Sequence, residues 1–223
     1  MERHFDEELK GLRKDILKMS DFARQAISES IEALKNRNNV QAQNVIDADS
    51  SVDELELVID EKCIDLIARY QPMAKDLRLI ATGMKLNAEL ERIADLAVDI
   101  AQRVLELNDK PLLKPLIDIP KLSAVAENMV RQAIDAFIKK DADLANKVIE
   151  SDNEADNLRT SICTELINDY MAKDAGTATR AVPLLLIARH LERICDHASN
   201  IAEDIIYMVQ GKTIKHHHNE LKK

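Results

Sequence analysis

Residues 90–95 read Leu90-Glu91-Arg92-Ile93-Ala94-Asp95, and the chain repeats them 101 residues later as Leu191-Glu192-Arg193-Ile194-Cys195-Asp196. Each copy lies in a long segment whose apolar residues recur at alternating spacings of three and four, which is the pattern of an amphipathic α-helix that packs against other helices. In the first segment these apolar positions are Leu79, Gly83, Leu86, Leu90, Ile93, Ala97, Ile100 and Val104. In the second they are Leu184, Ile187, Leu191, Ile194, Ala198, Ile201, Ile205 and Met208.

The repeat extends over both halves of the chain. Arg24-Gln25-Ala26-Ile27 matches Arg131-Gln132-Ala133-Ile134, and Val45-Ile46 matches Val148-Ile149. Turn-forming residues divide the chain into six long segments, three in each half. The sequence therefore predicts an all-α fold of six long helices, arranged as two tandem, pseudo-symmetric three-helix bundles with up-down-up topology.

The domain boundaries follow from the one long irregular connection. We expect a first bundle over 1–110, a Pro-rich linker over 111–119, a second bundle over 120–211 and a polar tail over 212–223. Pro183 does not suit a helix interior, so we expect it in the first turn of the sixth helix or at a kink there.

Composition supports this fold and excludes several others. Among 223 residues there are only four Gly, five Pro and six aromatic residues, too few for the turns and strands of an all-β domain, whereas 46% apolar content excludes a disordered chain. Cys63, Cys163 and Cys195 are far apart and set among apolar residues, as expected for reduced thiols packed in helices.

Charge narrows the expected partners and location. The net charge is −9 and the basic residues are scattered, so we expect no direct nucleic-acid partner. There is no run of 18 uncharged apolar residues, and the first residues are charged where an export signal would be apolar. The chain is therefore expected to be cytoplasmic, with membrane association only through partners.

Pairs of acidic residues spaced four apart recur at matched positions in the two halves. Since 40 acidic residues produce about seven such pairs by chance, it is the matched positions that carry information. The pairs are Asp49 and Asp53, Glu91 and Asp95, Asp152 and Asp156, and Glu192 and Asp196, with Asp99 and Asn200 one turn further on in each half.

These ten residues are the candidate metal ligands. Helical spacing places the pairs away from the apolar faces, so each bundle would carry a cluster of carboxylates on its surface. Such oxygen-only clusters suit hard cations, or iron and manganese bridged by carboxylates. Solvated helix faces remain the alternative, with Arg92 and Arg193 neutralising part of the charge. His190 and His197 are open as either nitrogen ligands or structural residues, and His216-His217-His218 as an adventitious metal site or a solvated tail.

The repeated L-E-R-I-x-D motif, the four matched acidic pairs and Gln71-Pro72-Met73-Ala74-Lys75-Asp76-Leu77-Arg78 resemble the PhoU family of phosphate-signalling proteins, over essentially the whole chain. This resemblance implies a negative regulator without enzymatic activity that links the ATPase subunit of the phosphate transporter to a sensor histidine kinase. It also implies a homodimer and multinuclear metal clusters at the acidic pairs, with iron, manganese, magnesium and zinc not distinguished.

Two other functions are open on the residues alone. One is a metal-free helical scaffold that binds partner helices. The other is a carboxylate-bridged di-iron enzyme, which is disfavoured because such enzymes use inward-facing Glu residues and Glu-x-x-His motifs, and no Glu-x-x-His occurs in this sequence.

Overall fold

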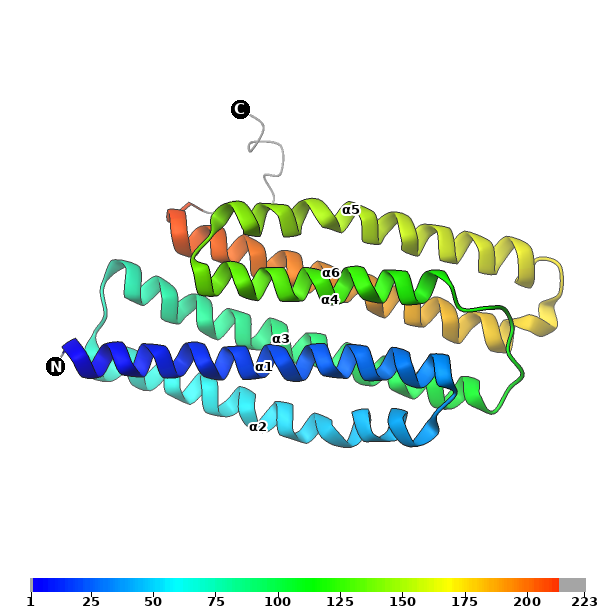
Figure 1. The fold of residues 1–223 in the computed structure, drawn as a ribbon, viewed down its shortest axis with the longest axis horizontal. Coiled ribbons are helices and arrows are strands. Elements are labelled where there is room, and N and C mark those ends of the chain that lie inside the picture. Colours follow the sequence, from blue (N-terminus) through cyan, green and yellow to red (C-terminus); the bar gives the residue numbers. More distant parts are fainter. Residues whose placement is uncertain (1, 213–223) are drawn as a thin grey trace, which may run out of the picture.

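The computed structural model describes residues 2–212 and is built from six long helices (Figure 1). They are α1 (Glu2–Asn36), α2 (Asn39–Tyr70), α3 (Ala74–Asn108), α4 (Asp118–Lys139), α5 (Ala142–Glu165) and α6 (Ala178–Gln210). A π-helical turn (Leu166–Met171) and a 3₁₀ turn (Ala175–Thr177) lie between α5 and α6. The predicted all-α fold class is confirmed.

Local sequence signals set the helix ends. Asn38 caps α2 by accepting a hydrogen bond from the Gln41 amide, and Asp141 caps α5 by accepting from the amides of Asp143 and Leu144. The C-cap residues that follow α2 and α6, Gln71 and Gly211, are both in the left-handed conformation. The π-helical turn was not predicted, because its sequence continues the apolar pattern of α5 without a break.

Helices α1, α2 and α3 pack on one another, as do α4, α5 and α6, and the two groups share one continuous core. All sixteen predicted apolar positions of α3 and α6 are buried. Each of these helices also buries a second set of residues, including Ile80, Ala101, Ala188 and Ala202. The second set is explained by the contact between α3 and α6, which is the most extensive helix pair in the described chain.

The segment between the two groups, residues 109–117, is held by hydrogen bonds at its start and by apolar contacts further along. Arg37 donates hydrogen bonds of 2.6 Å to the carbonyl oxygens of Asn108 and Lys110. Leu113 and Leu116 pack against the core. The linker was predicted over 111–119; in the structure α3 ends at Asn108 and α4 begins at Asp118, so that Pro120 lies in the first turn of α4.

Pro183 is six residues into α6 and not in its first turn, which corrects one of the two predicted placements. A proline cannot donate to the carbonyl four residues earlier, here that of Thr179. Lys110 Nζ donates to this carbonyl at 3.0 Å instead, so a side chain from the linker replaces the missing helical hydrogen bond.

Candidate functional site

The first carboxylate patch, as we name it, consists of Asp49 and Asp53 on α2 with Glu91, Asp95 and Asp99 on α3. Asp53 is exposed and the other four are partly exposed, so the patch lies at the surface, outside the core. The facing pairs come together because α2 and α3 run side by side and pack along their lengths (Figure 1).

Burial and mutual repulsion raise the pKa values of three carboxylates in the first patch. Partial burial, and then the negative charges of Asp53 and Asp95, raise the pKa of Asp49 above its ordinary value. Burial and the charge of Asp95 likewise raise the pKa of Glu91, and burial with the charges of Asp53 and Asp99 raises that of Asp95. Such repulsion is relieved by a proton or a cation.

The second carboxylate patch, Asp152 and Asp156 on α5 with Glu192 and Asp196 on α6, repeats this arrangement. Burial followed by the charges of the three other carboxylates raises the pKa of Asp152 to about 6. Burial and the charge of Asp196 raise the pKa of Glu192, and burial and Asp156 raise that of Asp196. The structure therefore brings together all four acidic pairs as two surface groups.

An arginine competes with any cation at the first patch. Arg92 Nε lies 3.5 Å from Glu91 Oε2, and Arg92 Nη1 lies 3.6 Å from Asp95 Oδ2. The prediction that Arg92 neutralises part of this charge is confirmed. With the side chains in these positions, no group of three or more His, Cys, Asp or Glu residues within the described part of the chain is set to hold a metal ion.

The donor set nevertheless suits a hard cation. Every carboxylate of the patches offers oxygen, and Oδ1 of Asp49 is buried without a hydrogen-bond partner. A buried oxygen without a donor costs free energy that a cation or a water molecule would recover. Small side-chain rotations would be needed for several carboxylates to share an ion.

Three residues of α6 near the second patch, His190, His197 and Asn200, contact α3 of the first half. His197 Nδ1 lies 2.6 Å from Oε2 of Glu89 on α3, and Asn200 donates to the same oxygen at 3.3 Å. His190 Nδ1 lies 3.7 Å from Asp99 Oδ2. These contacts join α6 to α3, so the structure places both histidines and Asn200 at the contact between the two halves.

Glu89 was missed by the sequence analysis. It has no acidic residue four positions away and so falls outside the repeated motif, although it meets two residues of α6. Nothing in the sequence around Glu89 marks it as a contact residue, because its partners His197 and Asn200 meet it only when the two halves pack together.

The cysteines and the tail complete the candidate set. All three thiols are free; Cys63 and Cys195 are buried, whereas Cys163 is partly exposed. Burial and then the charge of Asp152 raise the pKa of Cys195 well above its ordinary value, which keeps this thiol protonated beside the second patch.

His216, His217 and His218 lie outside the described residues. Among residues 2–212, none of the helices is apolar over a length sufficient to span a bilayer.

Comparison with known proteins gives one consistent result. A family description named PhoU domain matches residues 16–104 and again 119–205. The chain is 40% identical over 211 residues to the phosphate-specific transport system accessory protein PhoU homolog of Aquifex aeolicus, covering 95% of each chain. It is 34% identical over 212 residues to the protein PhoU of Escherichia coli, covering 95% of this chain and 88% of the relative.

Solved structures agree with these sequence matches. The crystal structure of PhoU from Pseudomonas aeruginosa superposes with a TM-score of 0.89 at 35% identity, covering 93% of this chain and 100% of that one. The phosphate transport system regulatory protein PhoU from Streptococcus pneumoniae superposes with a TM-score of 0.87 at 26% identity, covering 94% and 98%. With two family domains, relatives of this identity along nearly its whole length and solved PhoU structures that superpose closely on it, the chain belongs to the PhoU family.

Proposed function

We propose that this protein is a negative regulator of phosphate uptake and of phosphate-starvation signalling. The carrying observation is the similarity, along 95% of the chain, to proteins named accessory proteins of the phosphate-specific transport system. The regulator acts in the cytoplasm as a homodimer and has no catalytic activity. Its partners are the ATPase subunit of the phosphate transporter and the sensor histidine kinase of the phosphate response.

We further propose that the two carboxylate patches bind multinuclear metal clusters of iron, manganese, magnesium or zinc. Support comes from the oxygen-only donors, their raised pKa values and the unpartnered Oδ1 of Asp49. Asp49, Asp53, Glu91 and Asp95 would hold ions at the first patch, and Asp152, Asp156, Glu192 and Asp196 at the second. Bound ions would invert the negative field of each patch and so favour contact with acidic groups on a partner.

The test is a binding measurement with a variant that changes charge and little else. Glu91→Gln, Asp95→Asn, Glu192→Gln and Asp196→Asn are combined in one protein, and its affinity for the purified ATPase subunit is measured with and without divalent metal. We expect metal to strengthen binding by the unaltered protein and to have no effect on the variant. If both proteins bind the ATPase subunit with the same affinity, with and without metal, the patches have no metal-dependent role in binding.

A metal-free scaffold is the second candidate, and the pairing of Arg92 with Glu91 and Asp95 favours it. Elemental analysis of protein purified without a histidine tag separates the two. Iron, manganese, magnesium or zinc at one or more ions per chain supports the clusters. Metal-free protein that still binds the ATPase subunit supports the scaffold.

A further inference from the structure

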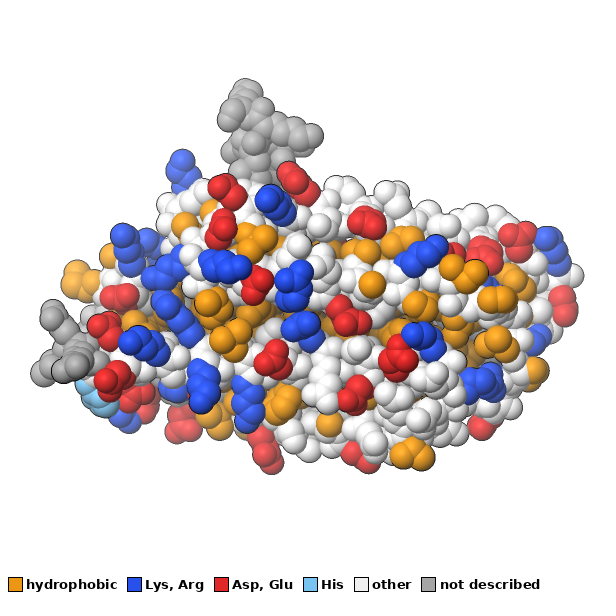
Figure 2. Space-filling model, viewed as in Figure 1, with side chains coloured by type: hydrophobic (Ala, Val, Ile, Leu, Met, Phe, Trp, Pro, Cys, Tyr) orange, Lys and Arg blue, Asp and Glu red, His pale blue; other side chains and the backbone are white. Residues whose placement is uncertain are grey.

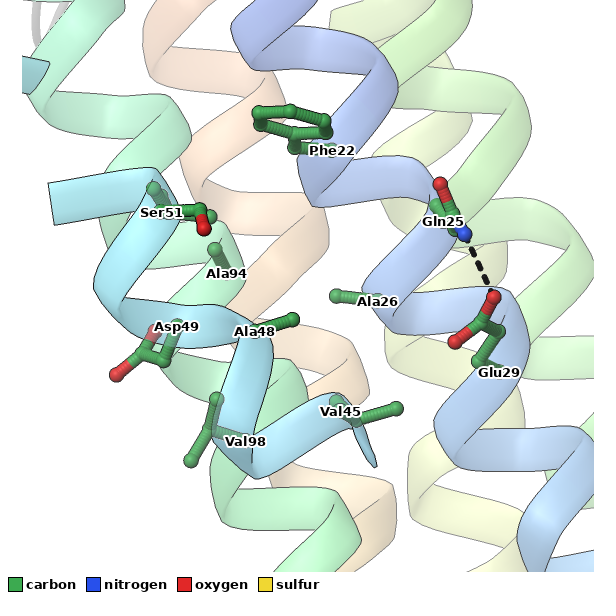
Figure 3. Close-up of a pocket in the computed structure, with 11 residues that line it drawn as sticks. Phe22, Gln25, Ala26, Glu29, Val45, Ala48, Asp49, Ser51, Ala94 and Val98 are labelled. Carbon is green, nitrogen blue, oxygen red and sulfur yellow. Dashed lines mark hydrogen bonds between the residues drawn. The ribbon is translucent and has the colours of Figure 1, made fainter. Parts of the chain in front are cut away.

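A groove of about 210 Å³ separates α1 from α2 in the first half, beside the first carboxylate patch (Figure 3). Its floor is apolar, with Val45, Val52 and Ala94 buried at 3%, 5% and 1% exposure. Ala26 of α1 and Ala48 of α2 point toward each other across it, and because both side chains are short the space between the helices stays open. The groove is thus shaped to take an apolar stem.

The lining has polar groups on both helices: Gln25 and Glu29 on α1, and Asp49 and Ser51 on α2. Gln25 Nε2 donates to Glu29 Oε1 at 2.7 Å, which uses one oxygen of the carboxylate (Figure 3). Two acceptors remain at the mouth, Glu29 Oε2 and the side-chain oxygen of Gln25, and neither accepts a hydrogen bond from another residue in the described part of the chain. The lining contains no lysine, arginine or histidine. The groove therefore combines an apolar floor with a surplus of acceptors and the negative charges of Glu29 and Asp49.

The internal repeat provides a control within the same molecule. Glu29 corresponds to Ala136 and Phe22 to Met129, both fully buried, and partly buried Ala26 corresponds to fully buried Ala133. The second half therefore lacks the carboxylate and covers the matching alanine. The groove is a property of the first half that the duplicated fold does not require.

The surface around the groove carries side chains of both charges. Figure 2 shows lysine and arginine side chains spread over the exposed faces of α1 and α4, together with acidic ones. Lys18 Nζ lies 5.3 Å from the centre of the Phe22 ring, so a cation of the chain itself already covers one face of this ring. A cationic ligand entering between α1 and α2 meets Glu29 without meeting a basic residue in the lining.

We infer that this groove receives an arginine side chain presented by a partner protein. The methylene stem lies between Ala26 and Ala48, and the guanidinium group donates to Glu29 and Gln25. A guanidinium group has five N–H donors in a planar fork and suits two adjacent acceptors better than an ammonium group does. The volume is sufficient, since a cavity of about 150 Å³ holds benzene, with six heavy atoms against the seven of an arginine side chain.

The experiment is an NMR titration of the isotope-labelled full-length chain with N-acetyl-arginine methylamide at millimolar concentrations. N-acetyl-citrulline methylamide, which has the same shape without the charge, is the matched ligand control. We expect saturable shifts confined to amides of residues 22–29 and 45–52, and at least fivefold weaker binding of the citrulline compound. Equal binding of the two compounds, or shifts centred elsewhere, would overturn the proposal.

Variants test the groove itself. Glu29→Gln is expected to weaken arginine-amide binding at least fivefold, and Ala48→Leu to abolish it by filling the groove. Ser151→Leu, the equivalent change in the second half, should leave binding unchanged. Gln25→Ala is a second variant that removes one acceptor and should weaken binding by two- to fivefold while the variant melts like the unaltered protein. Self-association of the chain that Ala48→Leu abolishes would assign the groove to a second copy and contradict the inference.

Discussion

Lys85 Nζ lies 2.9 Å from Oδ1 of Asp204, and this ion pair joins α3 of the first half to α6 of the second. The carboxylate is almost completely buried, with 4% of its side chain exposed, whereas half of the lysine side chain is in solvent. Lys85 Nζ also lies 5.8 Å from the ring centre of Tyr207. The two halves are therefore held together by electrostatic contacts as well as by their shared apolar core.

Lys85→Met should destabilise the protein by about 1–3 kcal/mol, because Asp204 stays buried while losing its cationic partner. The free energy of unfolding is measured by urea titration. Lys173→Met is the control, since Lys173 pairs with Asp169 and both side chains are mostly exposed. The control should change stability by less than about 0.5 kcal/mol. Equal losses in the two variants would show that the burial of Asp204 has no energetic consequence.

Lys110→Met should cost about 0.5–1.5 kcal/mol, because the Thr179 carbonyl loses the donor that replaces the amide missing at Pro183. The same change made in a Pro183→Ala background should cost less than half as much, since the introduced alanine supplies a backbone N–H to the Thr179 carbonyl. Urea titration of the four proteins gives the coupling between the two positions. Additive effects would show that Lys110 acts independently of the proline.

The helices and their core faces could be predicted from the sequence because each depends on local spacing. The apolar residues of α3 recur at helical intervals, and Gly83 and Ala97 continue the pattern although neither side chain is large. The acidic pairs could be placed beside one another for the same reason, because positions four apart share a helix face and α2 and α3 are consecutive.

What the sequence did not reveal depends on contacts between the halves. Asn200 matches Asp99 in the repeat, and only the packing of α6 on α3 places its amide against Glu89. The buried Asp204 looks in sequence like any other charged position near a helix end, although it meets Lys85 of the other half. The groove at Ala26 and Ala48 depends on how far α1 stands from α2, which no periodicity encodes.

Asp152→Asn should stabilise metal-free protein at pH 7.5 by about 1–2 kcal/mol, a value reduced for partial solvent screening. The pKa of Asp152 is raised from 3.8 to about 6, so the folded state holds the proton more tightly than the unfolded state. Stability is therefore lost as the pH rises from about 4 to 6, and the full cost is present above pH 6. At low pH, near the ordinary pKa of an aspartate, the substitution should have little effect.

The measurement is a set of urea titrations between pH 4 and 8 in the presence of a chelator. Glu154→Gln provides the control, because Glu154 is an exposed residue of the same helix. Its effect should stay nearly constant over this range. A benefit of Asp152→Asn that is as large at pH 4 as at pH 7.5 would contradict the assignment of the repulsion to an ionised carboxylate.

Arg92→Gln should strengthen divalent cation binding at the first patch about three- to tenfold, because a cation and Arg92 compete for Glu91 and Asp95. Manganese binding is measured by calorimetry on the unaltered protein and on the variant. The matched change at the second patch is Arg193→Gln. It acts on Asp196, whose pKa burial raises overall and the charge of Arg193 partly offsets. Removing both arginines should therefore strengthen both sites, and removing one should strengthen only its own. If neither variant binds manganese, the carboxylates serve as solvated helix faces and the metal-free scaffold becomes the better account of the protein.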